Sequence, residues 1–94
     1  MLGVSLKIDM EINLKLRDQI FEIIENQIRD NDPLETKLTF EKLRKEGNSK
    51  FVTKQLIGQC VAVELFRIMR FQESFNEERY IKNLLNLPKE PTEL

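Results

Sequence analysis

The chain has 94 residues, of which 40% are hydrophobic and 33% are charged, and its formal net charge is -1. This length suits one domain with one hydrophobic core, and the composition excludes a disordered or collagen-like chain. The nearly balanced charge gives no overall positive field that would attract nucleic acid or an anionic membrane.

Residues 4–16 alternate strictly, with an apolar residue at every even position and a polar residue at every odd position. This period of two is typical of a β-strand with one buried face. Because no second strand is predicted, we expect residues 1–13 to form an extended N-terminal arm that pairs with the same segment of another copy. The alternative is an arm laid over the helices or a partly disordered leader. The interface candidates are the apolar residues of the arm, Val4, Leu6, Ile8 and Met10.

The rest of the sequence predicts an all-α fold, a small four-helix bundle in a single helical domain over residues 14–88. The expected helices cover residues 14–30, 33–46, 50–71 and 77–87, and residues 89–94 are expected to form a flexible C-terminal tail. In the first helix, apolar residues recur at helical spacing. These residues are Leu16, Ile20, Ile23, Ile24 and Ile28.

The start of the second helix is predicted from a capping pattern. Asp32 is the expected N-cap, Pro33 the first helical residue, and Glu35 the third residue of a capping box. Gly47 suits a left-handed C-terminal position. The predicted apolar face of this helix consists of Leu34, Leu38, Phe40 and Leu43.

The third predicted helix is the central element, because its apolar residues cover two adjoining faces. One row contains Val52, Leu56, Cys60 and Val63, and the other contains Ile57, Val61, Leu65 and Ile68. A helix that is apolar on two faces must be covered by other helices. Ser49 is the expected N-cap of this helix and Asn76 that of the fourth helix, where Phe75 and Tyr80 have the spacing of a hydrophobic staple.

Residues that could support catalysis are few. The sequence has no histidine, which is the usual base for a hydroxyl or thiol nucleophile. The one cysteine, Cys60, lies in the central helix, where burial would make a thiol inert. A single cysteine, the absence of a signal-peptide pattern and the lack of ~20 consecutive apolar residues predict a cytoplasmic protein without a membrane span.

Carboxylates provide the alternative chemistry. Facing glutamates on bundle helices can hold metal ions, usually together with histidines, so Glu22, Glu25 and Glu64 define an alternative metal-binding or enzymatic function. Glu64 is unusual because it lies within the apolar central helix. We expect Glu64 and Arg67 to be polar residues of the core. The partner of Glu64 could be Arg67, three residues away, or a basic residue of another helix, such as Arg17 or Arg29.

Nucleic-acid binding is a second alternative. The basic residues of the second predicted helix are balanced by acidic neighbours. A helix-turn-helix protein presents a short, exposed, polar second helix to the major groove, whereas the helix that follows Gly47 is long and apolar on two faces. The sequence therefore disfavours this function.

The order and spacing of several segments resemble a group of small uncharacterised prokaryotic proteins, a domain-of-unknown-function family. The similarity covers roughly residues 16–88 and implies an all-helical domain with no assigned activity. The segments that carry the resemblance are Phe21 to Ile28, Asn31 to Glu35, Phe40 with Leu43, Gly47 to Ser49, Phe75 to Ile81, and Leu87-Pro88.

Together these features predict a non-enzymatic protein-interaction or structural module. We expect it to form a homodimer or to bind another protein, without a cofactor. No catalytic, cofactor-binding or metal-binding residue is assigned from the sequence.

Overall fold

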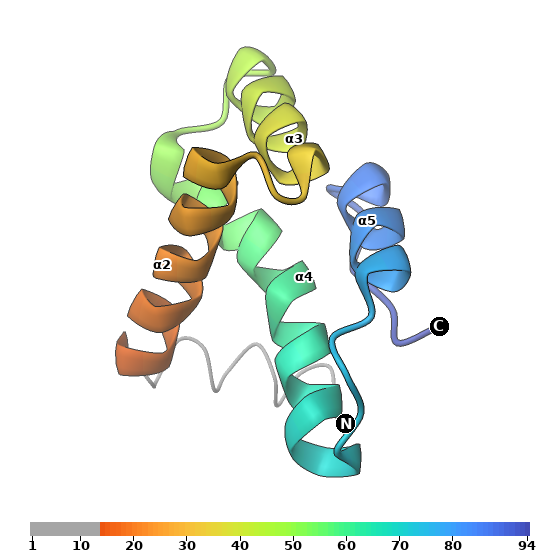
Figure 1. Ribbon diagram of the computed structural model, residues 1–94. Coiled ribbons are helices and arrows are strands. Elements are labelled where there is room, and N and C mark those ends of the chain that lie inside the picture. Colours follow the sequence, from red (N-terminus) through yellow and green to blue (C-terminus); the bar gives the residue numbers. More distant parts are fainter. Residues whose placement is uncertain (1–13) are drawn as a thin grey trace.

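The computed structural model describes residues 14–94, which contain four α-helices and no strand. The helices are α2 (Leu14–Asp30), α3 (Leu34–Lys45), α4 (Lys50–Phe71) and α5 (Glu77–Asn86) (Figure 1). The predicted all-α class is confirmed, and each helix end lies within one residue of its expected position. The N-terminal arm, including Val4, Leu6, Ile8 and Met10, lies outside the described residues.

Helix α4 is the central element of the fold. It packs against α2, α3 and α5, and α3 also contacts both α2 and α5. Five consecutive residues, from Cys60 to Glu64, are buried, so the middle of α4 is covered on every side and not only on the two predicted faces. The hydrophobic core combines α4 with residues of the three other helices and of the segment after α5. Its buried residues are Ile20, Ile24, Leu43, Ile57, Cys60, Val61, Ala62, Tyr80, Leu84 and Leu87.

Two of the predicted helix caps are present. The Ser49 hydroxyl accepts a hydrogen bond from the backbone N–H of Val52 at 3.1 Å. The Asn76 side chain accepts from the N–H of Arg79 at 3.0 Å. Phe75 also packs edge-on against Tyr80, with ring centroids 5.3 Å apart. This contact is the one expected of a hydrophobic staple.

The start of α3 differs from the prediction. Pro33, and not Asp32, is the N-cap residue, and no side-chain hydrogen bond caps this helix. The capping box is therefore absent, although Glu35 lies in the first turn, where a carboxylate is favoured by the helix dipole. At the other end, Gly47 has a φ of 102°, which is in the left-handed region that glycine adopts readily.

The buried face of α3 is also different from the predicted one. Leu34 and Leu38 are about half exposed, whereas Thr36 and Thr39 are buried. Thr36 is buried because its hydroxyl belongs to a buried polar network. Gln27 Oε1 accepts hydrogen bonds of 2.8 Å from both Thr36 Oγ1 and Tyr80 Oη, and the two hydroxyls lie 3.2 Å apart. The hydroxyl of Thr36 thus has hydrogen-bond partners inside the bundle, which permits this threonine to be buried although it lies outside the predicted apolar face.

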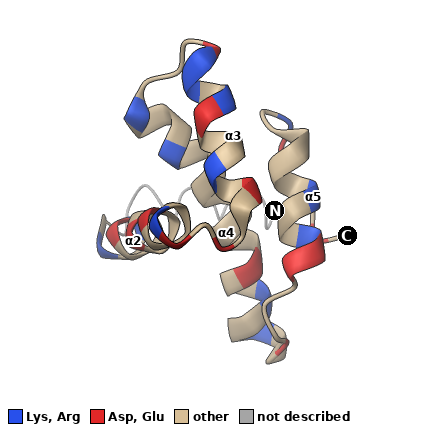
Figure 2. Cartoon of the chain, turned by 45° about the horizontal axis from the view of Figure 1, so that its top comes forward, with Lys and Arg blue, Asp and Glu red and all other residues tan. Residues whose placement is uncertain are grey.

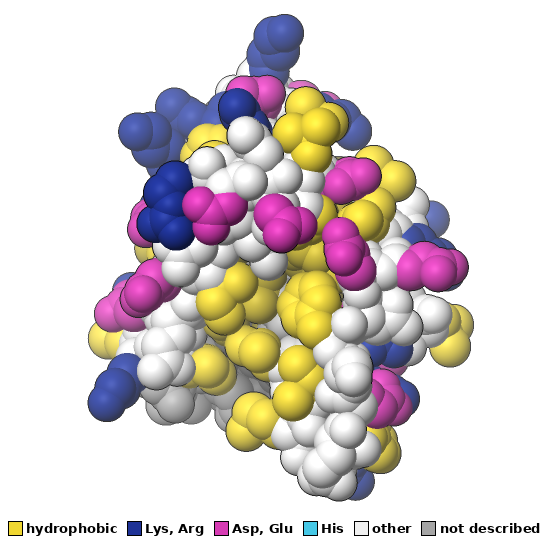
Figure 3. Space-filling model, viewed as in Figure 1, with side chains coloured by type: hydrophobic (Ala, Val, Ile, Leu, Met, Phe, Trp, Pro, Cys, Tyr) yellow, Lys and Arg dark blue, Asp and Glu magenta, His cyan; other side chains and the backbone are white. Residues whose placement is uncertain are grey.

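The surface of the described residues mixes charges of both signs with exposed apolar side chains. Lysine and arginine alternate with acidic residues along α3 (Figure 2). Hydrophobic side chains gather over the middle of the face seen in Figure 3, between α2 and the segment that joins α4 to α5. None of the helices in residues 14–94 is long and apolar enough to cross a membrane.

Candidate functional site

The most concentrated polar chemistry lies where α4, α5, the connection between them and the C-terminal segment (residues 88–94) meet. We refer to this group as the C-terminal polar cluster. It links five charged side chains from four parts of the chain and one buried amide. Its residues are Glu64, Arg67, Glu73, Arg79, Asn83 and Glu93.

A buried ion pair is the centre of this cluster. The Glu64 side chain is 0% exposed and that of Arg79 is 7% exposed. Arg79 Nε donates to Glu64 Oε2 at 2.6 Å, and Arg79 Nη2 donates to Glu64 Oε1 at 2.8 Å. The backbone N–H of Asn76 donates to the same Oε1 at 2.9 Å. Both carboxylate oxygens therefore have charge-assisted partners, as a buried charge requires.

The local structure of α5 places Arg79 in this position. Because Asn76 caps the helix through the N–H of Arg79, the first turn of α5 begins directly beside Glu64. The same residue, Asn76, thus caps α5 with its side chain and contacts Glu64 with its backbone. The hydrogen bond that Arg79 donates to Glu64 raises the pKa of Arg79, so the guanidinium stays charged. The pair joins α4 to α5 through a defined bidentate geometry.

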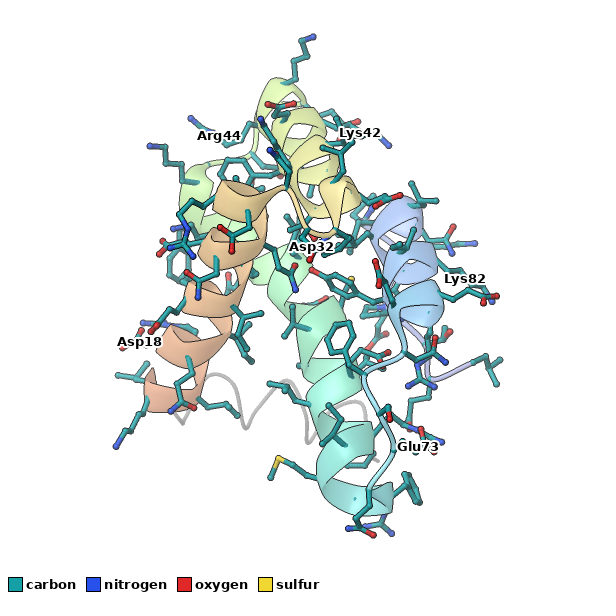
Figure 4. The ribbon with its side chains drawn as sticks, viewed as in Figure 1. Asp18, Asp32, Lys42, Arg44, Glu73 and Lys82 are labelled. Carbon is teal, nitrogen blue, oxygen red and sulfur yellow. The ribbon has the colours of Figure 1, made fainter. Side chains whose placement is uncertain are left out.

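Arg67 extends the cluster toward solvent. Its Nε and Nη2 donate to the two carboxylate oxygens of Glu73 at 3.1 and 2.6 Å, and its Nη1 donates to Glu93 Oε1 at 2.9 Å. Figure 4 shows Glu73 on the segment that connects α4 and α5. The hydrogen bond from Arg67 lowers the pKa of Glu73. Arg67 therefore bridges the connection and the C-terminal segment.

The C-terminal segment is held by the side chain of Asn83, which is 2% exposed. Asn83 Nδ2 donates to the carbonyl oxygen of Thr92 at 2.9 Å, and the N–H of Thr92 donates to Asn83 Oδ1 at 3.1 Å. Arg79 Nη1 also donates to the carbonyl oxygen of Glu93 at 3.3 Å. The sequence predicted a flexible tail at residues 89–94. In the structure this segment has no helix or strand, but it makes specific contacts with α4 and α5.

The partner of Glu64 is therefore on α5, and not one of the three arginines that the sequence suggested. Arg67 binds Glu73 and Glu93 instead. Arg29 pairs with its neighbour Asp30 on the surface. The guanidinium carbon of Arg17 lies 5.3 Å from the centre of the Phe51 ring, in a cation–π contact.

The three glutamates of the alternative metal site do not form a cluster. Glu22 and Glu25 are exposed on α2, and Glu25 pairs with Lys54, whereas Glu64 is buried against Arg79. Within residues 14–94, no group of three or more histidine, cysteine, aspartate or glutamate residues is placed to hold a metal ion.

Cys60 lies inside the core. Burial, together with the nearby charge of Glu64, raises the pKa of its thiol from 9.0 to about 12. The thiolate is the reactive form of cysteine. This thiol is therefore protonated at neutral pH and shielded from reagents.

Arg79 and Asn83 were not predicted from the sequence as members of the cluster. Both lie on the buried face of α5, at helical spacing from Tyr80, Leu84 and Leu87. Polar residues on an apolar helix face were the available signal. Leu85, an apolar residue of the same helix, is 66% exposed.

No protein-family model, no curated protein and no solved structure matches the chain. The function is therefore inferred from the geometry of the described residues. The similarity to small prokaryotic helical proteins stays a prediction from the sequence.

Proposed function

We propose that this protein is a non-enzymatic interaction module that self-associates through its N-terminal arm. The arm would contribute an apolar edge made of Val4, Leu6, Ile8 and Met10. An alternating segment of this kind gains stability by laying its apolar side chains on an apolar surface and by pairing its backbone with another chain.

The observation that carries the proposal is the exposed apolar surface of the helical domain. Met69 and Phe71, at the C-terminal end of α4, are 76% and 47% exposed, and Phe75 in the following connection is 37% exposed. Hydrophobic side chains that gather on one face, as in Figure 3, mark surfaces for contact with other proteins. Such a surface can receive the apolar face of an arm.

The reactive groups of the described residues support a binding role over a catalytic one. Both oxygens of Glu64 are used by Arg79 and Asn76, and the buried Cys60 thiol has a raised pKa. These contacts stabilise the fold and leave neither group available to a substrate.

The test is the solution mass of the full chain, measured by light scattering over a concentration series. We expect a dimer that becomes a monomer when residues 1–11 are deleted. The paired substitution Leu6→Asp with Ile8→Asp should have the same effect, because it places charge on the apolar face. Lys7→Glu, on the polar face of the same arm, is the matched control and should leave the dimer intact. A dimer that persists without residues 1–11, or a monomer in every case, would refute the proposal.

A further inference from the structure

The contacts of the C-terminal segment have the form of peptide recognition. The side-chain amide of Asn83 both donates to and accepts from the backbone of Thr92. This is the exchange of two hydrogen bonds that one residue of a β-ladder makes with its partner. Because both bonds go to the backbone, Asn83 accepts any residue type at this position that has a free N–H.

The next residue supplies the selectivity. The carboxylate of Glu93 accepts from Arg67 at 2.9 Å, and its backbone carbonyl accepts from Arg79 at 3.3 Å. Backbone hydrogen bonds that provide affinity, together with a pocket for one side chain that provides specificity, are how proteins read extended peptides. Here the recognised side chain is an acid.

The two arginines of the site are held in place by contacts that do not involve the C-terminal segment. Arg79 is fixed by Glu64, and Arg67 is fixed by Glu73, each through two hydrogen bonds. A recognition surface that is ordered before binding loses little conformational entropy when a ligand arrives. The surface therefore has the properties of a binding site that the C-terminal segment occupies.

We propose that Arg67, Arg79 and Asn83 form a docking site for an extended acidic peptide of a partner protein. The C-terminal segment occupies this site within the same chain. The partner segment is defined by its chemistry: an extended residue with a free N–H and C=O, followed by a glutamate. The sequence of residues 91–93, Pro-Thr-Glu, is the template for this ligand. This proposal does not depend on the self-association through residues 4–10.

Occupancy by its own chain should weaken binding of an external peptide. A tethered ligand on a short link has an effective concentration on the order of 1 mM. A free peptide that binds the open site with a Kd of about 100 μM would therefore bind the intact protein roughly tenfold more weakly. Releasing the C-terminal segment should restore the tighter affinity.

The experiment measures the fluorescence anisotropy of a labelled peptide with the sequence of residues 88–94. It compares the intact chain with a released variant, the full chain carrying Thr92→Pro and Glu93→Gln. Proline removes the N–H that donates to Asn83, and glutamine removes the charge that pairs with Arg67. We expect the released variant to bind the peptide roughly tenfold more tightly than the intact chain. Equal affinity for both proteins, or no binding by the released variant, would overturn the proposal.

Two neighbouring arginines of α4 provide the matched control. In the released variant, Arg67→Ala should abolish peptide binding. Arg70→Ala should leave it unchanged, because Arg70, like Arg67, lies over the Phe71 ring but makes no hydrogen bond or ion pair with Glu93. A labelled peptide in which Glu93 is replaced by Gln should lose most of its affinity. Retention of binding by the Arg67→Ala protein would contradict the assignment of Arg67 as the residue that binds the glutamate.

A second measurement avoids the substitutions in the C-terminal segment. With several millimolar unlabelled peptide, the amide NMR signals of Thr92 and Glu93 in the intact chain should move toward values of a free segment. The side-chain amide signals of Asn83 should keep their bound positions. Unchanged signals for Thr92 and Glu93 would overturn the proposal. Conversion of a dimer to a monomer by Glu93→Gln alone would assign the site to a second copy, and would also overturn it.

Discussion

Replacing Arg79 by methionine tests the role of the buried ion pair directly. The substitution keeps much of the length and apolar volume of the side chain. It leaves the Glu64 carboxylate, which is 0% exposed, with only the backbone N–H of Asn76. Two charge-assisted hydrogen bonds are lost, and removing one partner of a buried pair typically costs about 3–5 kcal/mol. A domain of this size has a free energy of unfolding of about 5–14 kcal/mol, so Arg79→Met should remove roughly a fifth or more of it.

The assay is guanidinium unfolding followed by helical circular dichroism, with Arg79→Met, Glu64→Leu and the double variant compared in a cycle. We expect the double variant to recover most of the stability, with a loss below about 2 kcal/mol, because no unpaired charge then stays buried. The coupling energy between the two sites should be at least about 2 kcal/mol. Lys82→Gln, on the outer face of α5 (Figure 4), is the control and should change stability by less than ~0.5 kcal/mol. A loss below about 1 kcal/mol for Arg79→Met, or a double variant as unstable as the single one, would refute this reasoning.

Three further predictions concern groups elsewhere in the described residues. Tyr80→Phe removes a buried hydroxyl that donates to Gln27, and should lower the free energy of unfolding by about 1–2 kcal/mol; a change within error would contradict the role of the network. Ser49→Ala removes the N-cap of α4 and should cost about 1 kcal/mol, whereas Ser74→Ala, an exposed serine of the connection, should have little effect in the same denaturant titration. Burial raises the pKa of the Cys60 thiol from 9.0 to about 12, so the unfolded chain releases this proton first as the pH rises. The contribution of this thiol to the free energy of unfolding should therefore be present below pH 9 and fall above it by up to about 1.4 kcal/mol per pH unit. In Cys60→Ala, the free energy of unfolding should fall less steeply between pH 8.5 and 10.

The sequence was sufficient to predict the helices because their signals are local. Ser49, Gly47 and Asn76 mark helix ends through backbone preferences that do not depend on distant residues. The uncharged run of α4 predicted its central position because an apolar helix has to be covered. The bounds of all four helices were therefore predicted to within one residue of the observed ones.

The orientation of the helix faces could not be predicted with the same success. Leu34, Leu38 and Leu85 are apolar but exposed, and Thr36 is polar but buried. Hydrophobicity ranks each residue alone, whereas the burial of Thr36 depends on hydrogen bonds with Gln27 and Tyr80 that are 9 and 44 residues away. The cap of α3 failed for a related reason, since sequence gives the residues that can cap a helix but not the backbone geometry that decides whether they do.

In the candidate site, too, the features that depend on neighbouring residues were predicted and the contacts between distant residues were not. Glu64 was recognised as unusual because an acid in an apolar run is visible in the sequence. Its partner was not recognised, because Arg79 lies 15 residues away on another helix and competes with three arginines that seem equally suitable. Thr92 gave no signal, and the polar position of Asn83 on the buried face of α5 did not reveal its partner, since a side-chain amide that binds a backbone depends only on geometry.

The buried pair has a consequence for binding that its contribution to stability does not explain. Apolar residues of similar size stabilise a core as well as a buried ion pair does, so such a pair is weak support for a purely stabilising role. The pair does, however, fix the orientation of the Arg79 side chain. Its two parallel hydrogen bonds fix how Arg79 approaches α4, and this arrangement directs the remaining Nη1 group toward the carbonyl of Glu93. A bundle with Glu64→Leu and Arg79→Met should therefore be nearly as stable as the natural chain and still lose part of its hold on an acidic segment, which separates the binding role of the pair from its role in folding.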